Sequence, residues 1–192
     1  QARVLRMDYD TTRTRESYEQ ILSAFGNGQA DILVGTQMIV KGHDFPDVTL
    51  VGIVAADISL YASDYRAAER TFQLLTQAVG RAGRGSKAGE AVIQTYMPEH
   101  YSIQTAAKQD YDAFYEQEIL YRELMGYPPV DEMLGIYLSG KDLEKLESCA
   151  EQLAEWIRNA HVEGLCLIGP ADAALARKND SYRRRHCPKN YR

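Results

Sequence analysis

The chain has 192 residues, of which 45% are apolar and 26% are charged, and its net charge at pH 7 is −5. These values are typical of a globular protein with one domain or two small ones, and they exclude disordered, fibrous and collagen-like chains. No apolar run approaches the roughly 18 residues that a membrane-spanning helix needs, and the N-terminal Gln-Ala-Arg-Val-Leu lacks the apolar core of a signal peptide. We therefore expect a cytoplasmic protein without a membrane partner.

The first hundred residues alternate between short apolar runs and helical patterns. The runs predict strands over residues 3–7, 31–35, 49–56 and 91–96, and the spacing of apolar residues predicts helices over 14–26 and 66–79. The runs at 31–35 and 49–56 are almost continuously apolar, as in strands buried on both faces of a parallel sheet. The alternation predicts an α/β fold, a parallel sheet whose strands are joined by right-handed crossovers.

The pattern changes after Met97-Pro98. Residues 101–125 are predicted to form one or two helices, and Gly126-Tyr-Pro-Pro129 forces a turn. A strand over 134–138, a helix over 142–160 with one apolar stripe and a strand over 165–168 predict a small second α/β unit. We expect three segments, 1–98, 99–128 and 129–192. Residues 184–192 lack the apolar alternation of a strand, so the last segment is expected to be truncated or divergent at its end.

The charges are unevenly distributed along the chain. From Ala174 onward there are seven basic residues and one acidic residue, Asp180, so this end carries +6 and the remainder −11. Such a split favours a polyanionic partner, and a solvated basic tail is the alternative. The three cysteines, Cys149, Cys166 and Cys187, are far apart, which predicts ordinary thiols and no zinc or other metal site in the chain.

The first motif with chemical content is Gln77-Ala-Val-Gly80-Arg81-Ala-Gly83-Arg84. If the preceding helix continues through it, Gln77, Arg81 and Arg84 share one face. Two glycines cost a helix roughly 2 kcal/mol relative to alanine, so we infer that something approaches the backbone closely at Gly80 and Gly83. Two arginines on a rigid support suit a phosphate group, whose oxygens match the guanidinium fork. The alternative is a glycine-rich basic turn that ends the helix.

The second motif, Gly35-Thr-Gln-Met-Ile-Val-Lys-Gly-His-Asp-Phe-Pro46, directly follows a predicted strand. Ligand sites in open α/β sheets lie at the carboxyl ends of the strands, so this loop is well placed for one. Thr36, Gln37 and backbone amides suit nucleic-acid phosphates, and Asp44 suits a ribose or an arginine. A loop shaped only by its glycines and Pro46 is the alternative. His43 has no partner at ligand spacing, so we expect a surface residue and not a metal ligand.

Two further observations concern nucleotide binding. Asp57, at the end of the apolar run 51–57, resembles a magnesium-binding acid at a strand end, but that pattern is weak and common. The sequence contains no Gly-x-x-x-x-Gly-Lys-Ser/Thr. The chain therefore cannot hold a nucleoside triphosphate by itself in the P-loop manner.

Together the two motifs resemble motifs V and VI of the second RecA-like lobe of superfamily 2 helicases. The residues around them are similar to the primosomal protein N′ (PriA) family of replication-restart helicases, notably Met7-Asp-Tyr-Asp-Thr-Thr12, Arg66-Ala-Ala-Glu-Arg-Thr-Phe-Gln-Leu-Leu-Thr-Gln77 and Gly126-Tyr-Pro-Pro129. The similarity extends from about residue 3 to residue 183. It implies a RecA-like parallel-sheet helicase lobe followed by a small α/β C-terminal domain.

The resemblance implies roles at the nucleotide. ATP binds between two RecA-like lobes in such helicases, so Arg84 would be the arginine finger that reaches the γ-phosphate, with Arg81 beside it. Gln77 would couple the nucleotide site to motion. Gly42 and Asp44 would lie at the same cleft. ATP and Mg²⁺ would be shared with a first lobe that carries the P-loop and the magnesium-binding acidic box, and this chain alone would be inactive.

The resemblance also implies partners. Thr36, Gln37 and Met38 would face single-stranded DNA and grip its backbone without reading its bases. The family acts as an ATP-dependent 3′ to 5′ DNA helicase in replication restart and primosome assembly, on single-stranded and forked DNA, with primosome and single-strand-binding proteins. Its zinc-binding cysteines precede the segment that this chain resembles. The alternatives are a non-catalytic module that docks DNA or proteins, and another superfamily 2 helicase.

Overall fold

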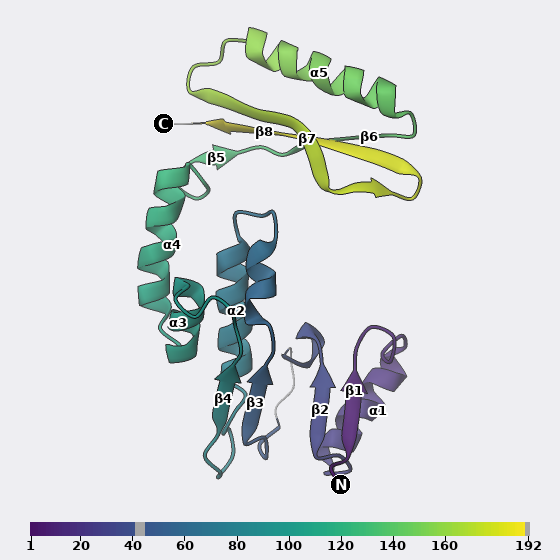
Figure 1. The fold of residues 1–192 in the computed structure, drawn as a ribbon, viewed down its shortest axis with the longest axis vertical. Helices are drawn as coiled ribbons and strands as arrows, with labels where there is room; N and C mark the ends of the chain where they lie inside the picture. Colours follow the sequence, from purple (N-terminus) through teal and green to yellow (C-terminus); the bar gives the residue numbers. More distant parts are fainter. Residues whose placement is uncertain (41–44, 191–192) are drawn as a thin grey trace. The chain divides into compact units, whose positions relative to one another are not determined.

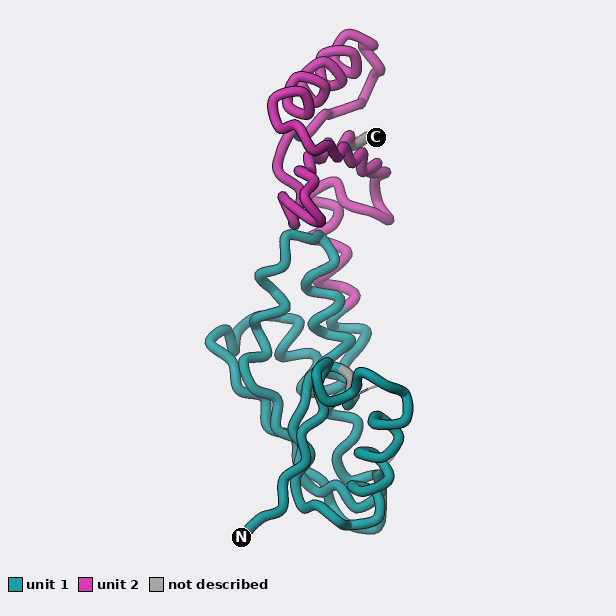
Figure 2. Tube along the Cα trace, turned by 90° about the vertical axis from the view of Figure 1, so that its right-hand side faces the viewer, with its two compact units in different colours: residues 1–114 teal, residues 115–192 magenta. Residues whose placement is uncertain are grey.

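The computed structural model describes residues 1–40 and 45–190 (Figure 1). The chain divides into two compact units, residues 1–114 and residues 115–192, which Figure 2 distinguishes by colour. The division falls within one helix, α4 (Tyr111–Met125). In the described part of the chain, no helix is both long enough and apolar enough to cross a membrane.

Unit 1 begins with two parallel strands joined by a helix. Strand β1 (Val4–Met7) pairs in parallel with β2 (Ile32–Gly35), and α1 (Arg15–Gly26) connects them. The helix starts at Thr14 because the Thr14 side chain accepts a hydrogen bond from the backbone N–H of Ser17, whose side chain accepts one from the backbone N–H of Thr14. This reciprocal cap satisfies two N–H groups that have no partner inside the helix.

The same arrangement is repeated once in unit 1. The elements that follow are η1 (Gln37–Val40), β3 (Leu50–Ile53), η2 (Ala56–Tyr61), α2 (Ala67–Val79) and β4 (Glu90–Ile93). Strands β3 and β4 are parallel, with α2 in the connection between them. The predicted α/β class with parallel strands is confirmed. The strand predicted over 49–56 ends at Ile53, because Ala55 has a left-handed backbone (φ 51°) and η2 begins directly after it.

The prediction that the apolar strands are buried on both faces is wrong for the structure of this chain. Ile32 and Val34 of β2 are 45% and 52% exposed, and Leu50 of β3 is 61% exposed. Among the described residues of unit 1, these three side chains are thus only about half covered. A continuous apolar run therefore identified the strands but not the number of covered faces.

The core of unit 1 is formed by helices that follow one another in the chain. Phe72 and Leu75 of α2 pack with Ile103 of α3 (Tyr101–Lys108) and with Phe114 at the start of α4. The rings of Phe72 and Phe114 stack with 4.1 Å between their centroids and 10° between their planes. The region predicted to hold one or two helices thus contains two, separated at Gln109, which has a left-handed backbone (φ 54°).

Unit 2 is an antiparallel sheet with one long helix. Its elements after α4 are β5 (Glu132–Met133), β6 (Ile136–Gly140), α5 (Leu143–Asn159), β7 (Leu165–Lys178) and β8 (Ser181–Asn190). Strand β8 is central: it pairs with β7 on one side and with β5 and β6 on the other. Helix α5 starts at Asp142, whose side chain accepts from the backbone N–H of Lys145, and buries Leu146, Ala150 and Ala154.

Residues 184–190 lack the apolar alternation that is typical of a strand, yet they form the second part of β8. Strand β8 continues through this basic stretch, because neighbouring strands on both sides bond its backbone. The hairpin turn that aligns it with β7 is made by Asn179 and Asp180, both with left-handed backbones (φ 49° and 58°), which these two residue types tolerate best after glycine. Strand β7 is correspondingly longer than the predicted 165–168.

Candidate nucleotide and nucleic-acid interface

The first motif forms a turn at the end of α2. The helix stops at Val79, and Gly80 closes it by donating its backbone N–H to the carbonyl of Thr76. The helix thus ends at the residue that the sequence predicts, and the alternative of a glycine-rich basic turn holds; the condition under which Gln77, Arg81 and Arg84 would share one helical face is not met. Gln77 lies on the last turn of α2, and both arginines lie in the turn beyond it, because Arg81 N–H bonds only three residues back, to Ala78.

Close backbone packing explains the glycine at position 83. Gly83 has φ 71°, and a Cβ atom there would lie 2.5 Å from the backbone nitrogen of Gly89. A Cβ atom on Gly89 would in turn lie 2.1 Å from the backbone nitrogen of Gly83. The close approach inferred from the sequence at Gly83 is therefore that of the protein's own chain, where the turn meets the residues leading into β4.

Arg84 is held at the end of α2. Its Nε–H donates to the carbonyl of Gly80 at 2.7 Å, one of the carbonyls that the end of a helix leaves without an intrahelical partner. Arg84 is exposed and Arg81 is half-buried. Two guanidinium groups thus lie three residues apart on a turn whose backbone is fixed by Gly80 and Gly83.

The second motif begins at the carboxyl end of β2, as predicted. A Cβ atom on Gly35 would lie 2.2 Å from the carbonyl oxygen of Met7 on β1, so only glycine fits there. Thr36 and Gln37 are exposed. The backbone of Met38 lies in η1, whose first turn is closed by the bond from the N–H of Ile39 to the carbonyl of Thr36. Gly42, His43 and Asp44 lie outside the described residues.

The structure brings the first motif against the segment that follows the second. The N–H of Gly83 donates to the carbonyl of Val48 at 3.0 Å. A Cβ atom on Gly85 would lie 2.2 Å from the carbonyl oxygen of Pro46. These contacts join two motifs that are about forty positions apart in the sequence. No local sequence pattern predicted the contacts.

Asp57 is buried and hydrogen-bonded to other residues of unit 1. Its side chain is buried, and its Oδ1 accepts hydrogen bonds from the backbone N–H of Tyr96 at 3.0 Å and from the hydroxyl of Thr95 at 2.9 Å. The bond from Tyr96 and then that from Thr95 lower the pKa of this carboxyl. Asp57 thus ties η2 to the segment after β4. Among the described residues no group of His, Cys, Asp and Glu side chains is placed to hold a metal ion.

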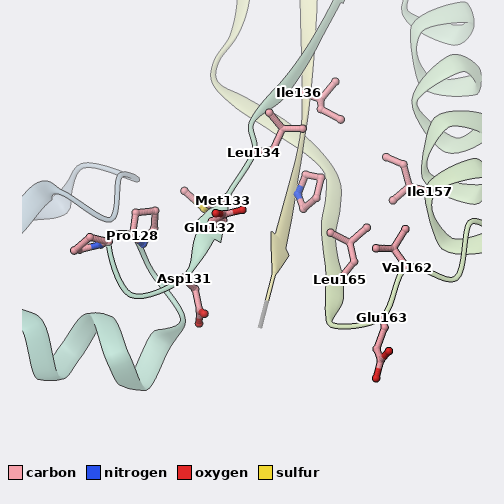
Figure 3. A pocket seen from close by; sticks show the side chains of 12 residues that line it. Pro128, Asp131, Glu132, Met133, Leu134, Ile136, Ile157, Val162, Glu163 and Leu165 are labelled. Carbon is pink, nitrogen blue, oxygen red and sulfur yellow. The ribbon is translucent and has the colours of Figure 1, made fainter. Parts of the chain in front are cut away.

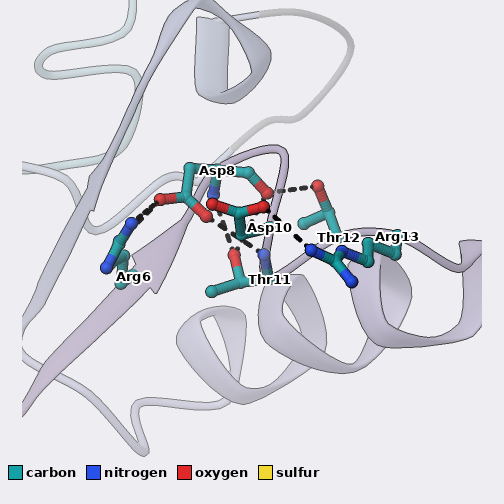
Figure 4. A network of polar contacts seen from close by, with 6 residues as sticks. All are labelled: Arg6, Asp8, Asp10, Thr11, Thr12 and Arg13. Carbon is teal, nitrogen blue, oxygen red and sulfur yellow. Dashed lines mark hydrogen bonds and ion pairs between the residues drawn. The ribbon is translucent and has the colours of Figure 1, made fainter.

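A polar network that sequence reasoning did not single out closes the end of β1 (Figure 4). Asp8 accepts a hydrogen bond from Arg6 Nε at 2.6 Å and one from the backbone N–H of Thr11 at 3.0 Å. The hydroxyl of Thr12 donates to the Asp8 carbonyl at 2.5 Å. The Asp-Tyr-Asp-Thr-Thr run is the signal that could have found it. The network fixes a loop at the carboxyl edge of β1, the edge from which Thr36 also emerges, since β1 and β2 are parallel.

Unit 2 contains an apolar groove with acidic residues at its margin (Figure 3). It has a volume of about 820 Å³, and its apolar wall includes Leu134, Ile157 and Val162. Three acidic residues, Asp131, Glu132 and Glu163, also line the groove.

Comparison with known proteins decides the family. Residues 2–86 match the model of the helicase conserved C-terminal domain. The chain is 48% identical over 182 residues to replication restart protein PriA of Bacillus subtilis, 41% over 181 residues to that of Synechocystis and 38% over 180 residues to that of Haemophilus influenzae. The chain belongs to the PriA family.

The comparisons also bear on fold and extent. They cover 95%, 94% and 94% of this chain but only 23%, 22% and 25% of these PriA proteins, so the chain spans about a quarter of their length. With the parallel strands of unit 1, the domain match confirms the predicted fold class, a RecA-like helicase lobe followed by a small α/β domain.

Proposed function

We propose that this chain is the second motor lobe and the following domain of an ATP-dependent 3′ to 5′ DNA helicase that acts in replication restart and primosome assembly. The observation that carries the proposal is the glycine-fixed turn bearing Arg81 and Arg84, in a chain that matches the helicase C-terminal domain and PriA relatives. The remaining length of those relatives leaves room for a first lobe.

At the nucleotide, Arg84 is the arginine finger and Arg81 assists it. A guanidinium is always charged and presents a fork of N–H donors, so it stabilises the negative charge that spreads over the transferring γ-phosphoryl. The turn fits this task because its backbone is fixed by packing at Gly83. Gln77, on the last turn of the helix that carries the turn, couples the site to motion, and Gly42 and Asp44 complete the cleft.

ATP and Mg²⁺ are held mainly by other parts of the full-length protein. The described residues offer no cluster of acidic side chains for Mg²⁺, whereas the two arginines fit phosphate oxygens. When bound, the nucleotide supplies the free energy of phosphoryl transfer. This chain supplies positive charge and a rigid support for it, so the fragment alone does not hydrolyse ATP.

On the DNA side, Thr36, Gln37 and Met38 grip the backbone of a single strand. Exposed Thr36 and Gln37 follow a strand end at the edge where α/β sheets bind ligands. Contacts to the backbone suit a motor that must move along any sequence. Single-stranded and forked DNA are the proposed substrates, and primosome and single-strand-binding proteins the proposed partners. A DNA substrate is in keeping with the cytoplasmic location expected from the sequence.

The proposed division of labour assigns residues 1–98 to the motor lobe, 99–128 to a helical connector and 129–192 to the C-terminal domain. The lobe carries both motifs. The connector includes α3 and α4, and the third segment contains the antiparallel sheet of unit 2.

The test is Arg84→Ala in the full-length protein. We expect DNA-stimulated ATP hydrolysis to fall about 10³-fold or more, with affinity for single-stranded DNA nearly unchanged. Arg15→Ala is the matched control, because Arg15 is an exposed arginine on α1 that pairs with Glu19 on the same helix. Equal loss of hydrolysis and DNA affinity would show that Arg84 binds DNA. ATP turnover by the 192-residue chain alone, abolished by Arg84→Ala, would refute the shared site.

A further inference from the structure

Three tyrosines of unit 1 lie at the carboxyl edge of its strands. Figure 1 shows that β1, β2, β3 and β4 all point the same way, so their carboxyl ends share one edge. Tyr9 comes shortly after β1, Tyr96 comes shortly after β4, and Tyr61 ends η2, the short helix that follows β3. We call these three residues the edge tyrosines. Thr36, which the proposed function assigns to DNA, leaves β2 at the same edge.

The edge tyrosines are exposed. Tyr9 is 81% exposed, Tyr61 is 70% exposed and Tyr96 is 83% exposed, the highest values for any tyrosine in the described part of the chain. Val54 and Ile58, which come between β3 and Tyr61, are exposed as well. One exposed apolar side chain is ordinary, but several gathered at one edge are typical of a surface that binds something.

The backbone that carries each ring is fixed by hydrogen bonds. The loop with Tyr9 is closed by Asp8, whose side chain accepts from the backbone N–H of Thr11 at 3.0 Å (Figure 4). The backbone N–H of Tyr96 donates to the buried carboxylate of Asp57. The rings therefore stand on ordered supports, and binding to them requires little further ordering of the chain.

The segment that carries Tyr61 begins with a strained residue. Ala55 has φ 51°, and its N–H donates to the Gln94 side chain at 2.6 Å. The N–H of Ala56 donates to the Gln94 carbonyl at 3.0 Å. An alanine keeps such a backbone only where its surroundings hold it, and strain of this kind gathers at functional sites. The hydroxyl of Tyr61 donates to Sδ of Met97 at 3.6 Å, so Tyr61 lies beside the segment of Tyr96.

The acidic side chains near the edge tyrosines are bonded to arginines or buried. Three ion pairs occur along this edge: Asp8 with Arg6, Asp10 with Arg13, and Asp64 with Arg66. Asp57 is buried. A surface that is rich in aromatic rings and whose carboxylates are paired suits the bases of a nucleic acid more than its phosphates, which require free positive charge.

We propose that the edge tyrosines stack on the bases of the single strand whose backbone Thr36 and Gln37 hold. Every base has a π face, so stacking on tyrosine does not depend on the base sequence, as a motor requires. A base paired within a duplex cannot present its face to a ring, so this edge accepts only unpaired DNA. The inference rests on the proposed function and adds contacts to the bases to those with the backbone.

The test uses the full-length protein and measures the concentration of oligothymidylate that half-saturates ATP hydrolysis. Tyr9→Leu, Tyr61→Leu and Tyr96→Leu keep an apolar side chain but remove the ring. Each should raise the half-saturating concentration about tenfold, the effect of one lost base stack, whereas phenylalanine at the same positions should not raise it. The slope of its logarithm against log salt should stay unchanged, because no phosphate contact is lost.

Two further variants separate this inference from the proposed function. Tyr111→Leu is the matched control, because Tyr111 is an exposed tyrosine at the start of α4 and lies outside the edge. It should leave the half-saturating concentration unchanged. The double variant Thr36→Ala/Gln37→Ala should raise this concentration. If it does so while the three leucine variants have no effect, the stacking is refuted and the proposed DNA contacts stand; if only the leucine variants act, the reverse holds.

Photocrosslinking tests the contact directly. Ultraviolet irradiation of the complex with an oligothymidylate that contains 5-iodouracil should modify the peptides with Tyr9, Tyr61 or Tyr96, and each crosslink should disappear in the corresponding leucine variant. Crosslinks confined to other peptides, or an equal effect of Tyr111→Leu on half-saturation, would overturn the proposal. Normal half-saturation in the leucine variants together with lost binding of a single-strand-binding protein would also overturn it and would assign the edge tyrosines to a protein partner.

Discussion

On helix α4, the guanidinium of Arg122 pairs with the carboxylate of Glu118, one turn earlier, at 2.7 Å, and both side chains are buried. The Arg122 Nη1 also donates to the carbonyl of Pro128 at 2.9 Å. The pair therefore anchors the end of α4 to the turn that leads into the sheet of unit 2. If one partner is removed, the other charge stays buried without water or an opposite charge to stabilise it, and the folded state is destabilised.

We expect Glu118→Ala to lower the free energy of unfolding by about 3–5 kcal/mol, the usual cost of removing one partner of a buried ion pair. Urea unfolding, monitored by circular dichroism, measures this change in the free energy of unfolding. Glu116→Ala, on the exposed side of the same helix, is the matched control and should change stability little. Equal effects of the two variants would mean that the pair with Arg122 adds nothing beyond helix propensity.

Gly83→Ala should impair the motor. An alanine at φ 71° is strained by about 1–2 kcal/mol, and its Cβ would collide with the backbone of Gly89, so the turn that carries Arg84 has to move. In the full-length protein we expect a fall in DNA-stimulated ATP hydrolysis with unchanged DNA binding. Gly52→Ala is the control, because a Cβ atom at Gly52 would meet no atom within 4 Å. Normal hydrolysis by Gly83→Ala would show that the turn need not be rigid.

His186 predicts a dependence of stability on pH. The ring is fully buried, and among the described residues neither ring nitrogen has a hydrogen-bond partner. Burial lowers the pKa of His186, opposed by Glu151 and reinforced by Arg158, both on α5. The folded state therefore favours the neutral ring. Stability from this residue is complete above the ordinary pKa of about 6.5 and is lost as pH falls, because the unfolded chain then binds the proton more readily.

The measurement is urea unfolding between pH 7.5 and 5, followed by the fluorescence of Trp156, the single tryptophan of the chain and a residue of α5. His186→Leu should raise the free energy of unfolding by about 1–3 kcal/mol at pH 7, since it removes buried polar atoms that have no partner, and should flatten the pH dependence. His161→Gln, at an exposed position, should change neither. A steep pH dependence that persists in His186→Leu would assign the effect to other groups.

Local patterns predicted most elements of the fold. The helix predicted over 142–160 is present as α5. It could be predicted because both its apolar stripe and its cap at Asp142 depend only on residues close together in the sequence. The strands of unit 1 were also recognisable from apolar runs. Their covered faces were not, because burial of Ile32 or Leu50 depends on which elements lie above the sheet and not on the strand itself.

Two features that the sequence left open, at Gly80 and in β8, have the same physical origin. Whether α2 continued past Val79 depended on Gly83 packing against Gly89 and Val48, contacts made by residues distant along the chain. Whether Arg183–Arg185 formed a strand depended on partners in β6 and β7. At the candidate site, residue types and order were readable from the sequence, whereas the adjacency of the two motifs came from the tertiary structure.

The exposed apolar side chains of the unit 1 strands have a practical consequence. Val34, Leu50 and Val92 present apolar side chains to water on short strands, and surfaces of this kind promote association between molecules. We expect the 192-residue chain to remain monomeric only when dilute, so that low concentration, low temperature and short storage are the conditions under which its binding properties can be measured.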